Sequence, residues 1–469
     1  GTVYLGGIAG CIAAAGGQIS YSHFSGSLAS SGRSLETVNE NNAVTAGINY
    51  VGGITGLVGG TVENCYTAAS QSVSAEYETA YVQTTFLGGI AGSVKSDGIL
   101  ADSHNNASVS FSSPKPTTSA TAYVGGVAGA LGGANNNTKA VSMNGCENNG
   151  SVQSKSDYHN VNLGGVVAHA VKVAVVDNCH NRVNGTVRAT KHTNGLEYIY
   201  MGGVIGRSLT SNISNLSNAA AVEIENLVST RGALNIGGCV GMLDSSIEGN
   251  NTILNSGNIT AKGECSATSY IAQGGVVGTM FVADGKLSYV KNTGWVTDEI
   301  SIIHKHVFSG GVVGLVRNTA TIDNVTNEGR IHFANSSVQM HENVALGGVV
   351  GGISALSDNN FAVTVSNSTN SGEVSRIAST AGIQKSAMVC GGIVGILKGA
   401  GSSVENCTNS GLVKMEGQNS TRLDAENDPI TTNANGGSCH TAGGIVGFAR
   451  GASGTPVTIS GCTNTGECY

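Results

Sequence analysis

Apolar residues return along this chain at fixed places around a pair of glycines. Two small apolar residues and usually a third glycine follow the pair, and the motif occurs twelve times. Typical copies are LGGIAG (87–92), VGGVAG (124–129) and CGGIVG (390–395). Successive copies lie 35 to 52 residues apart, with most spacings close to 37. Recurrence at this period predicts a repeat protein whose units stack on one another.

A second motif follows the glycine pair in most repeats. It is an Asn–x–Gly step with an apolar residue two places before the asparagine, as in GCENNGSV (145–152) and NCTNSGLV (406–413). We expect side-chain amides at one repeat position to form a column that is hydrogen-bonded from repeat to repeat. The asparagines expected in it are Asn148, Asn181, Asn218, Asn255, Asn292, Asn327, Asn370, Asn409 and Asn464.

The residues around these motifs favour strands over helices, because glycine costs about 1 kcal/mol against alanine in a helix and Val, Ile and Thr are weak helix formers. Leu163 precedes a glycine pair and Val167 stands four places further on, which predicts that both lie on one face of a single strand. Asn and Gly in the second motif suit a turn, since both tolerate positive φ. Each repeat is expected to form about three short strands.

Stacked repeats of this kind predict an all-β fold, a β-solenoid (β-helix) of about twelve coils with one coil per repeat. Right-handed winding is favoured, because connections between parallel strands usually have that hand. The sequence is interpreted as a single array over 1–469, with longer loops at about 26–50, 352–390 and 412–442.

The strand at the glycine pair carries apolar side chains on both of its faces. A strand of this type is normally covered on both sides. The variable loop between repeats is the first candidate for the cover, and another subunit or a ligand is the second. The residues of this packing or assembly face include Tyr50, Phe86, Tyr123, Ile54, Ile90 and Val127.

Five of the eleven cysteines share the repeat position two places before the asparagine or its substitute, where other copies carry aliphatic residues such as Leu216: Cys65, Cys146, Cys179, Cys407 and Cys462. Cysteine packs like a small apolar side chain, so buried thiols are expected. Cys146 with Cys179, and Cys407 with Cys462, fall on adjacent repeats, so disulfides between coils stay open as the alternative.

Charge and chemistry narrow the function classes. A net charge of −7 does not favour nucleic acid as a partner, and no apolar run approaches the ~18 residues of a membrane-spanning helix. We find no Cys–x–x–Cys pair and no converging carboxylates in the pattern. The sequence therefore predicts a protein that is not an enzyme, with no cofactor and no metal site.

Two segments, VGGITGLVGGTVENCYTAASQSV (51–73) and CGGIVGILKGAGSSVENCTNSGLV (390–413), resemble the GLUG motif of bacterial surface proteins. That family includes adhesins and the non-catalytic regions of immunoglobulin A peptidases. The resemblance implies an extracellular or cell-surface protein with a repetitive β-fold, and it implies no catalytic residues.

These observations favour a structural or adhesive protein that acts as a rod-like scaffold or surface fibre. One alternative is a subunit of a self-assembling filament, joined through uncapped end coils or the glycine-rich face. The other is a carbohydrate-active or receptor-binding β-helix whose site lies in a long loop. The partners to be considered are further copies of the chain and a glycan or protein ligand on a host or surface.

Overall fold

The computed structural model describes most of the chain. The described residues are 2–32, 37–38, 44–45, 47–77, 83–113, 120–132, 140–156, 160–171, 173–196, 198–209, 212–229, 232–248, 252–267, 269–300, 306–335, 344–354, 361–378, 388–416, 440–451 and 454–469.

The chain divides into two compact units. Unit 1 comprises Gly1–Glu223 with Cys239–Gly241, and unit 2 comprises Ile224–Gly238 with Met242–Tyr469. Both units are all-β, and their strands form parallel sheets stacked in register. The predicted β-solenoid is therefore confirmed. Among the described residues, no helix has the length and apolar character needed to cross a membrane.

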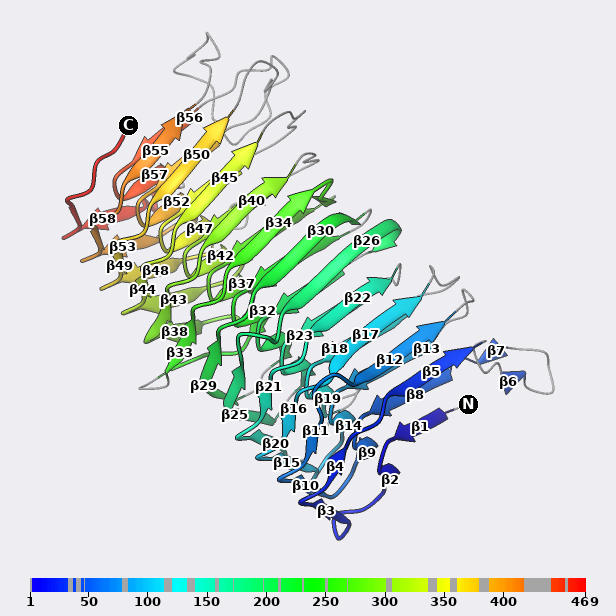
Figure 1. Cartoon of the computed structure of the whole chain (residues 1–469). Coiled ribbons are helices and arrows are strands. Elements are labelled where there is room, and N and C mark those ends of the chain that lie inside the picture. Colours follow the sequence, from blue (N-terminus) through cyan, green and yellow to red (C-terminus); the bar gives the residue numbers. More distant parts are fainter. Residues whose placement is uncertain are drawn as a thin grey trace. The chain divides into compact units, whose positions relative to one another are not determined.

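Each coil contributes to four sheets, numbered here in the order in which the chain enters them (Figure 1). Sheet 1 ends on the glycine pair, sheet 2 follows the pair, sheet 3 carries the asparagines, and sheet 4 follows the Asn–x–Gly turn. Sheet 1 contains β1 (Thr2–Gly6), β8 (Gly47–Gly52), β13 (Gln83–Gly88), β18 (Thr121–Gly125), β23 (Asn160–Gly164) and β27 (Tyr198–Gly202) in unit 1. In unit 2 it contains β31 (Ala233–Gly237), β36 (Tyr270–Gly274), β41 (His306–Gly310), β46 (Val344–Gly347), β51 (Met388–Gly391) and β56 (His440–Gly443).

Sheet 2 is equally regular. Its strands in unit 1 are β2 (Ala9–Ile12), β9 (Thr55–Val58), β14 (Ala91–Val94), β19 (Ala128–Leu131), β24 (Val167–Ala170) and β28 (Ile205–Leu209). Its strands in unit 2 are β37 (Val277–Met280), β42 (Val313–Val316), β47 (Val350–Ile353), β52 (Val394–Lys398) and β57 (Val446–Arg450).

Sheet 3 is built from short strands. In unit 1 they are β3 (Gln18–Ser20), β10 (Thr61–Glu63), β15 (Ile99–Ala101), β20 (Val141–Asn144), β25 (Ala174–Asn181) and β29 (Asn212–Asn218), with β4 (His23–Phe24), β11 (Tyr66–Thr67), β16 (His104–Asn105) and β21 (Glu147–Asn148). In unit 2 they are β33 (Ile253–Asn255), β39 (Val290–Asn292), β44 (Thr326–Asn327), β49 (Thr369–Asn370), β54 (Thr408–Asn409) and β59 (Thr463–Asn464). A further ladder precedes them there: β38 (Gly285–Ser288), β43 (Ala320–Asp323), β48 (Val363–Ser366), β53 (Ser403–Glu405) and β58 (Thr458–Ser460).

Sheet 4 completes each coil. It contains β5 (Leu28–Gly32), β12 (Ser72–Tyr77), β17 (Ser108–Ser113), β22 (Val152–Ser156) and β26 (Val187–Leu196) in unit 1. It contains β34 (Ile259–Gly263), β40 (Val296–Ile300), β45 (Ile331–Asn335), β50 (Val374–Ala378) and β55 (Val413–Glu416) in unit 2.

Equivalent residues of successive repeats pair directly. Tyr4 lies opposite Tyr50, and Phe86 lies opposite Tyr123. Because the register advances by one whole repeat at each step, one repeat makes one coil, as predicted. The hand of the winding stays a prediction.

The prediction of one strand running through the glycine pair was wrong. Strand β23 ends at Gly164 and a new strand, β24, starts at Val167. A Cβ on Gly164 would lie 1.9 Å from the Val167 carbonyl oxygen, so only glycine permits so sharp a reversal. The reversal also gives each coil more strands than the three expected.

Sheet 2 folds back over one face of sheet 1, and sheet 4 covers the other face. In unit 2, Phe308 of sheet 1 and Leu315 of sheet 2 belong to one buried apolar cluster. On the opposite face, Asp298 of sheet 4 accepts hydrogen bonds from Gln273 and Ser309 of sheet 1. A strand of the chain itself therefore supplies the cover that the sequence left open.

Of the loop predicted at 26–50, residues 33–36, 39–43 and 46 lie outside the described residues, and β6 (Thr37–Val38) and β7 (Val44–Thr45) form an antiparallel pair within it. The loop predicted at 352–390 is not continuous, because the segment 363–378 forms β48, β49 and β50 around its own Asn–x–Gly turn. Residues 355–360, 379–387 and 417–439 lie outside the described residues.

Candidate functional site

A column of buried asparagine side chains runs through sheet 3 of unit 1. Asn105 Nδ2 donates to Asn148 Oδ1, Asn148 Nδ2 to Asn181 Oδ1, and Asn181 Nδ2 to Asn218 Oδ1, at 2.8 to 2.9 Å. At its start, the Thr67 hydroxyl donates to Asn105 Oδ1 at 2.6 Å. Each amide thus bonds to the coil before it and the coil after it.

Unit 2 contains the same arrangement over six coils. Nδ2 of each asparagine donates to Oδ1 of the next at 2.7 to 2.8 Å, in the order Asn255, Asn292, Asn327, Asn370, Asn409 and Asn464. The second hydrogen of each Nδ2 goes to a carbonyl in its own coil, as from Asn292 to Gly294 at 2.8 Å. An amide satisfies both directions at once because it carries a donor and an acceptor.

The second glycine of each pair leaves space for an asparagine of this column. A Cβ on Gly126 would lie 2.3 Å from Cγ of Asn148, and one on Gly165 would lie 2.5 Å from Cγ of Asn181. Real Cβ contacts are never so short, so the second glycine of the pair makes room for the amide. The two motifs seen in the sequence are therefore two sides of one packing contact.

Two members of the column were missed by sequence reasoning. Asn105 is followed by Ala107 in place of glycine, so it has no Asn–x–Gly step. Thr67 is not an asparagine at all. Different signals could have found them. Thr67 stands two places after Cys65, as the asparagines stand two places after the other cysteines, and Asn105 stands as far behind Gly88 as Asn181 does behind Gly164.

The four cysteines of the two possible disulfides lie in sheet 3 just before the asparagines. Cys146 and Cys179 in unit 1, and Cys407 and Cys462 in unit 2, are free thiols. Cys179 Sγ contacts the Asp177 carbonyl oxygen at 3.2 Å, and Cys407 Sγ contacts that of Glu405 at 3.3 Å. Burial raises the pKa of Cys407 to about 11 and raises that of Cys179 strongly, with Cys146 as a further cause. The thiols of Cys179 and Cys407 are therefore protonated at neutral pH.

The predicted packing or assembly face lies inside unit 1. Tyr50, Phe86 and Tyr123 stack in one row, with ring centroids 4.9 and 4.8 Å apart. The Tyr123 ring lies 5.2 Å from the ring of His169 on sheet 2. Ile54, Ile90 and Val127 have no exposed surface. The structure gives this face to packing within the chain.

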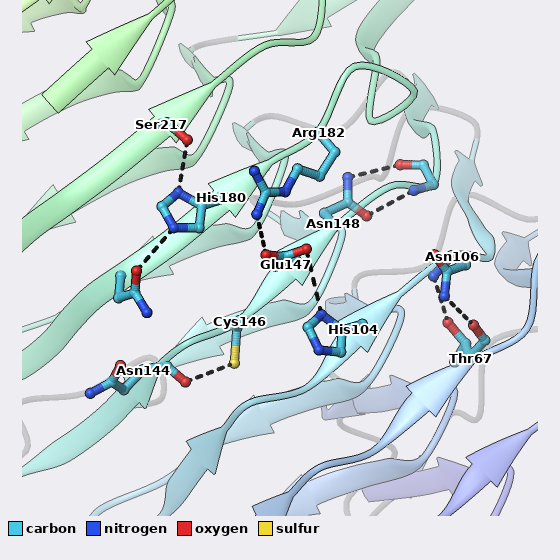
Figure 2. A network of polar contacts seen from close by, with 12 residues as sticks. Thr67, His104, Asn106, Asn144, Cys146, Glu147, Asn148, His180, Arg182 and Ser217 are labelled. Carbon is cyan, nitrogen blue, oxygen red and sulfur yellow. Dashed lines mark hydrogen bonds and ion pairs between the residues drawn. The ribbon is translucent and has the colours of Figure 1, made fainter.

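Beside the asparagine column, an outward polar network connects successive coils (Figure 2). Glu147 forms an ion pair with Arg182, and its other oxygen lies 3.7 Å from Nδ1 of His104. His180 bonds to Asn178 Oδ1 through Nε2 at 3.0 Å and to the Ser217 hydroxyl through Nδ1 at 2.7 Å. The network places histidines, a carboxylate and a guanidinium on one surface.

The neighbouring groups determine the protonation states of Glu147 and His180 in this network. The hydrogen bond from Arg182 lowers the pKa of Glu147, so the carboxylate stays ionised. Burial, with the nearby Arg182 charge, lowers the pKa of His180, so its ring is neutral at pH 7. Exposed ion pairs of this kind contribute little to stability, typically about 0–1 kcal/mol. Their chemistry is that of a fixed polar surface.

Among the residues that the structure describes, no group of three or more His, Cys, Asp or Glu side chains is arranged to hold a metal ion. Comparisons with protein-family models, with curated proteins and with solved structures find no match to this chain.

Proposed function

We propose that the chain is a non-enzymatic structural or adhesive scaffold of an extracellular surface. The observation that carries the proposal is the continuous amide column in each unit, in which every coil is hydrogen-bonded to the next by side chains as well as by backbone. Buried polar side chains are ordinarily kept for function or for specificity. Here they hold coils together.

Two further features support a scaffold. Polar side chains on the outer surface pair with one another, as Glu147 does with Arg182 beside sheet 3 and Arg330 with Glu373 at the turn into sheet 4. The resemblance of 51–73 and 390–413 to the GLUG motif points to the cell surface, where a scaffold must stay folded without chaperones.

Stretching single molecules from end to end tests the mechanical part of the proposal. A scaffold is expected to resist extension and then to release its coils in steps of roughly 13 nm, the extended length of one ~37-residue repeat. Extension at forces no greater than those of an unfolded chain would contradict the proposal. The variant Asn370→Ala, which interrupts one column in unit 2, is expected to lower the force of some steps and leave others unchanged.

Adhesion is a separate part of the proposal with its own test. The chain is incubated on an array of surface glycans and matrix proteins, and both retention of the chain and loss of the glycan are recorded. Retention without glycan loss supports an adhesive scaffold. Failure to bind any probe would remove adhesion and leave the scaffold, while release of shortened glycan would overturn the non-enzymatic assignment.

A further inference from the structure

A cluster of polar side chains lies between sheets 1 and 2 of unit 1, where most other coils place apolar or aromatic residues. His169 on β24 and Arg207 on β28 are in-register neighbours, and Asn162 on β23 lies between Tyr123 and Tyr200 in the facing sheet. The rings of Tyr123 and His169 are 5.2 Å apart, and Cζ of Arg207 lies 4.7 Å from the ring centroid of Tyr200.

Three buried atoms of this cluster have no hydrogen-bond partner among the residues that the structure describes. They are Nδ1 of His169, Oδ1 of Asn162 and Nε of Arg207. His169 is only 5% exposed and Asn162 only 3%. Unpaired polar groups at such depth are costly and normally have a partner. Three of them on neighbouring strands indicate one missing partner that serves all three.

The charge of the cluster indicates what that partner is. Among the described residues, no carboxylate forms an ion pair with Arg207, whereas Arg182 pairs with Glu147 and Arg330 with Glu373. Burial, together with the Arg207 charge, lowers the pKa of His169 to about 3, so the histidine is neutral. The cluster thus contains one cation without an anion.

We propose that Arg207, His169 and Asn162 form a binding site for a tetrahedral oxyanion, the phosphate or sulfate group of a free ion or of a larger ligand. The planar guanidinium offers two parallel N–H donors to two oxygens of such a group. The neutral imidazole donates one N–H, and the Asn162 amide, rotated by half a turn about its last bond, presents Nδ2.

The half-buried position of Arg207 gives the ligand a way in. Arg207 retains partial exposure, while His169 and Asn162 are almost completely buried. An oxyanion would therefore meet the guanidinium first and the two neutral donors second. A water molecule could fill one or two of the unpaired positions, but it would not neutralise the guanidinium.

Equilibrium dialysis of the whole chain against radiolabelled inorganic phosphate, at constant ionic strength, tests the site. We expect saturable binding of one phosphate per chain, competed by sulfate. Arg207→Gln is expected to bind at least about tenfold more weakly, because a charge-assisted pair of hydrogen bonds is lost. Methyl phosphate distinguishes the two sources: its binding indicates the end group of a larger ligand, and its exclusion indicates a free ion.

Arg317→Gln is the matched control. Arg317 also stacks on a tyrosine, Tyr270, at 5.2 Å, but its Nη1 already donates to the Tyr270 hydroxyl at 3.3 Å. Its loss is expected to leave phosphate binding unchanged. If Arg207→Gln does not fold, Arg207→Lys keeps the charge without the fork and is expected to bind several times more weakly than the parent. Absence of saturable binding to the parent chain, or parental affinity in the folded Arg207 variants, would overturn the site.

Discussion

Asp298 makes the stability of unit 2 dependent on pH. Its carboxyl is completely buried against sheet 1, where Gln273 Nε2 and the Ser309 hydroxyl donate to it. Arg376 occupies the same inward position two coils further on, but Phe333 lies between them in the register, so the guanidinium is not the direct neighbour of the carboxyl. Burial raises the pKa of Asp298 from 3.8 to about 7.

The sign of the effect follows from where the proton is held. The folded chain binds this proton more tightly than the unfolded chain, so its stabilising effect is fully present below pH 3.8 and is lost as pH rises through 7. A difference of about three pH units at about 1.4 kcal/mol each gives a loss of roughly 4 kcal/mol between pH 4 and pH 8. Oε1 of Gln273 has no hydrogen-bond partner, and after rotation of the amide it can accept the proton of neutral Asp298.

The variant Asp298→Asn removes the ionisation and nearly preserves the shape of the side chain. We expect its free energy of unfolding to match that of the parent near pH 4. Near pH 8 the variant is expected to be more stable than the parent by up to about 4 kcal/mol, and the cost of the altered hydrogen bonds reduces this gain. Trp295, the only tryptophan, lies three residues before Asp298 and is half exposed, so its fluorescence reports denaturant unfolding of this coil.

Glu299→Gln is the control, because it makes the same change of charge on the neighbouring, exposed residue. It is expected to reproduce the pH profile of the parent. If Asp298→Asn also gave a profile parallel to that of the parent between pH 4 and pH 8, Asp298 would not be the buried acid described here, and the reasoning would fail.

Three further substitutions test the packing of unit 2. Asn292→Ala removes an amide that bonds to Asn255, Asn327 and Gly294. Because these groups lose their partners, the free energy of unfolding measured by chemical denaturation should fall by about 2–4 kcal/mol. The neighbouring control, Thr293→Ala, should lower it by less than about 1 kcal/mol. Gly275→Ala would place a Cβ 2.0 Å from the Gly311 carbonyl oxygen, so it is expected to prevent folding of its coil, as measured by circular dichroism and hydrogen exchange. A Cβ on Gly16 would have no atom within 4 Å, so Gly16→Ala should leave both measurements unchanged. Tyr289 has a φ of 57° at a corner where later coils carry Asn324, Asn367 and Asn406; Tyr289→Asn should raise stability by about 1 kcal/mol, and an unchanged or lower melting temperature would contradict the strain assigned to this tyrosine.

The coil and its register could be predicted because both motifs recur at one spacing. The amides of Asn327 and Asn370 stand where the Asn–x–Gly step places them, and their hydrogen bond follows once coils are stacked. The reversal at the glycine pair could not be predicted. Gly164 and Gly165 show that the backbone needs room, but the two residues do not say whether the chain continues or folds back.

The sequence pattern also could not predict which single polar residues are buried. Asp298 stands in the sequence WVTDEI (295–300), where Asp and Glu are adjacent and either one could point inward. The register with Ala261 and Phe333 decides which one does. His169 and Arg207 are similar: their inward position depends on the fold-back of sheet 2, which the sequence does not reveal.

The contact between the two motifs also explains where the chain tolerates insertions. The second glycine of a pair lies against the asparagine of its own coil, as Gly311 lies against Asn327 and Gly348 against Asn370. Positions that must meet in this way in every coil leave little freedom for added residues in the strands that carry them. The stretch from the asparagine of one coil to the glycine pair of the next varies in length: it is about twice as long from Asn409 to Gly443 as from Asn292 to Gly310. The stretch between the glycine pair and the asparagine of one coil also varies, and is longer from Gly125 to Asn148 than from Gly202 to Asn218. Added residues therefore fall between the positions that must meet, where a scaffold can carry variable segments without disturbing the amide column.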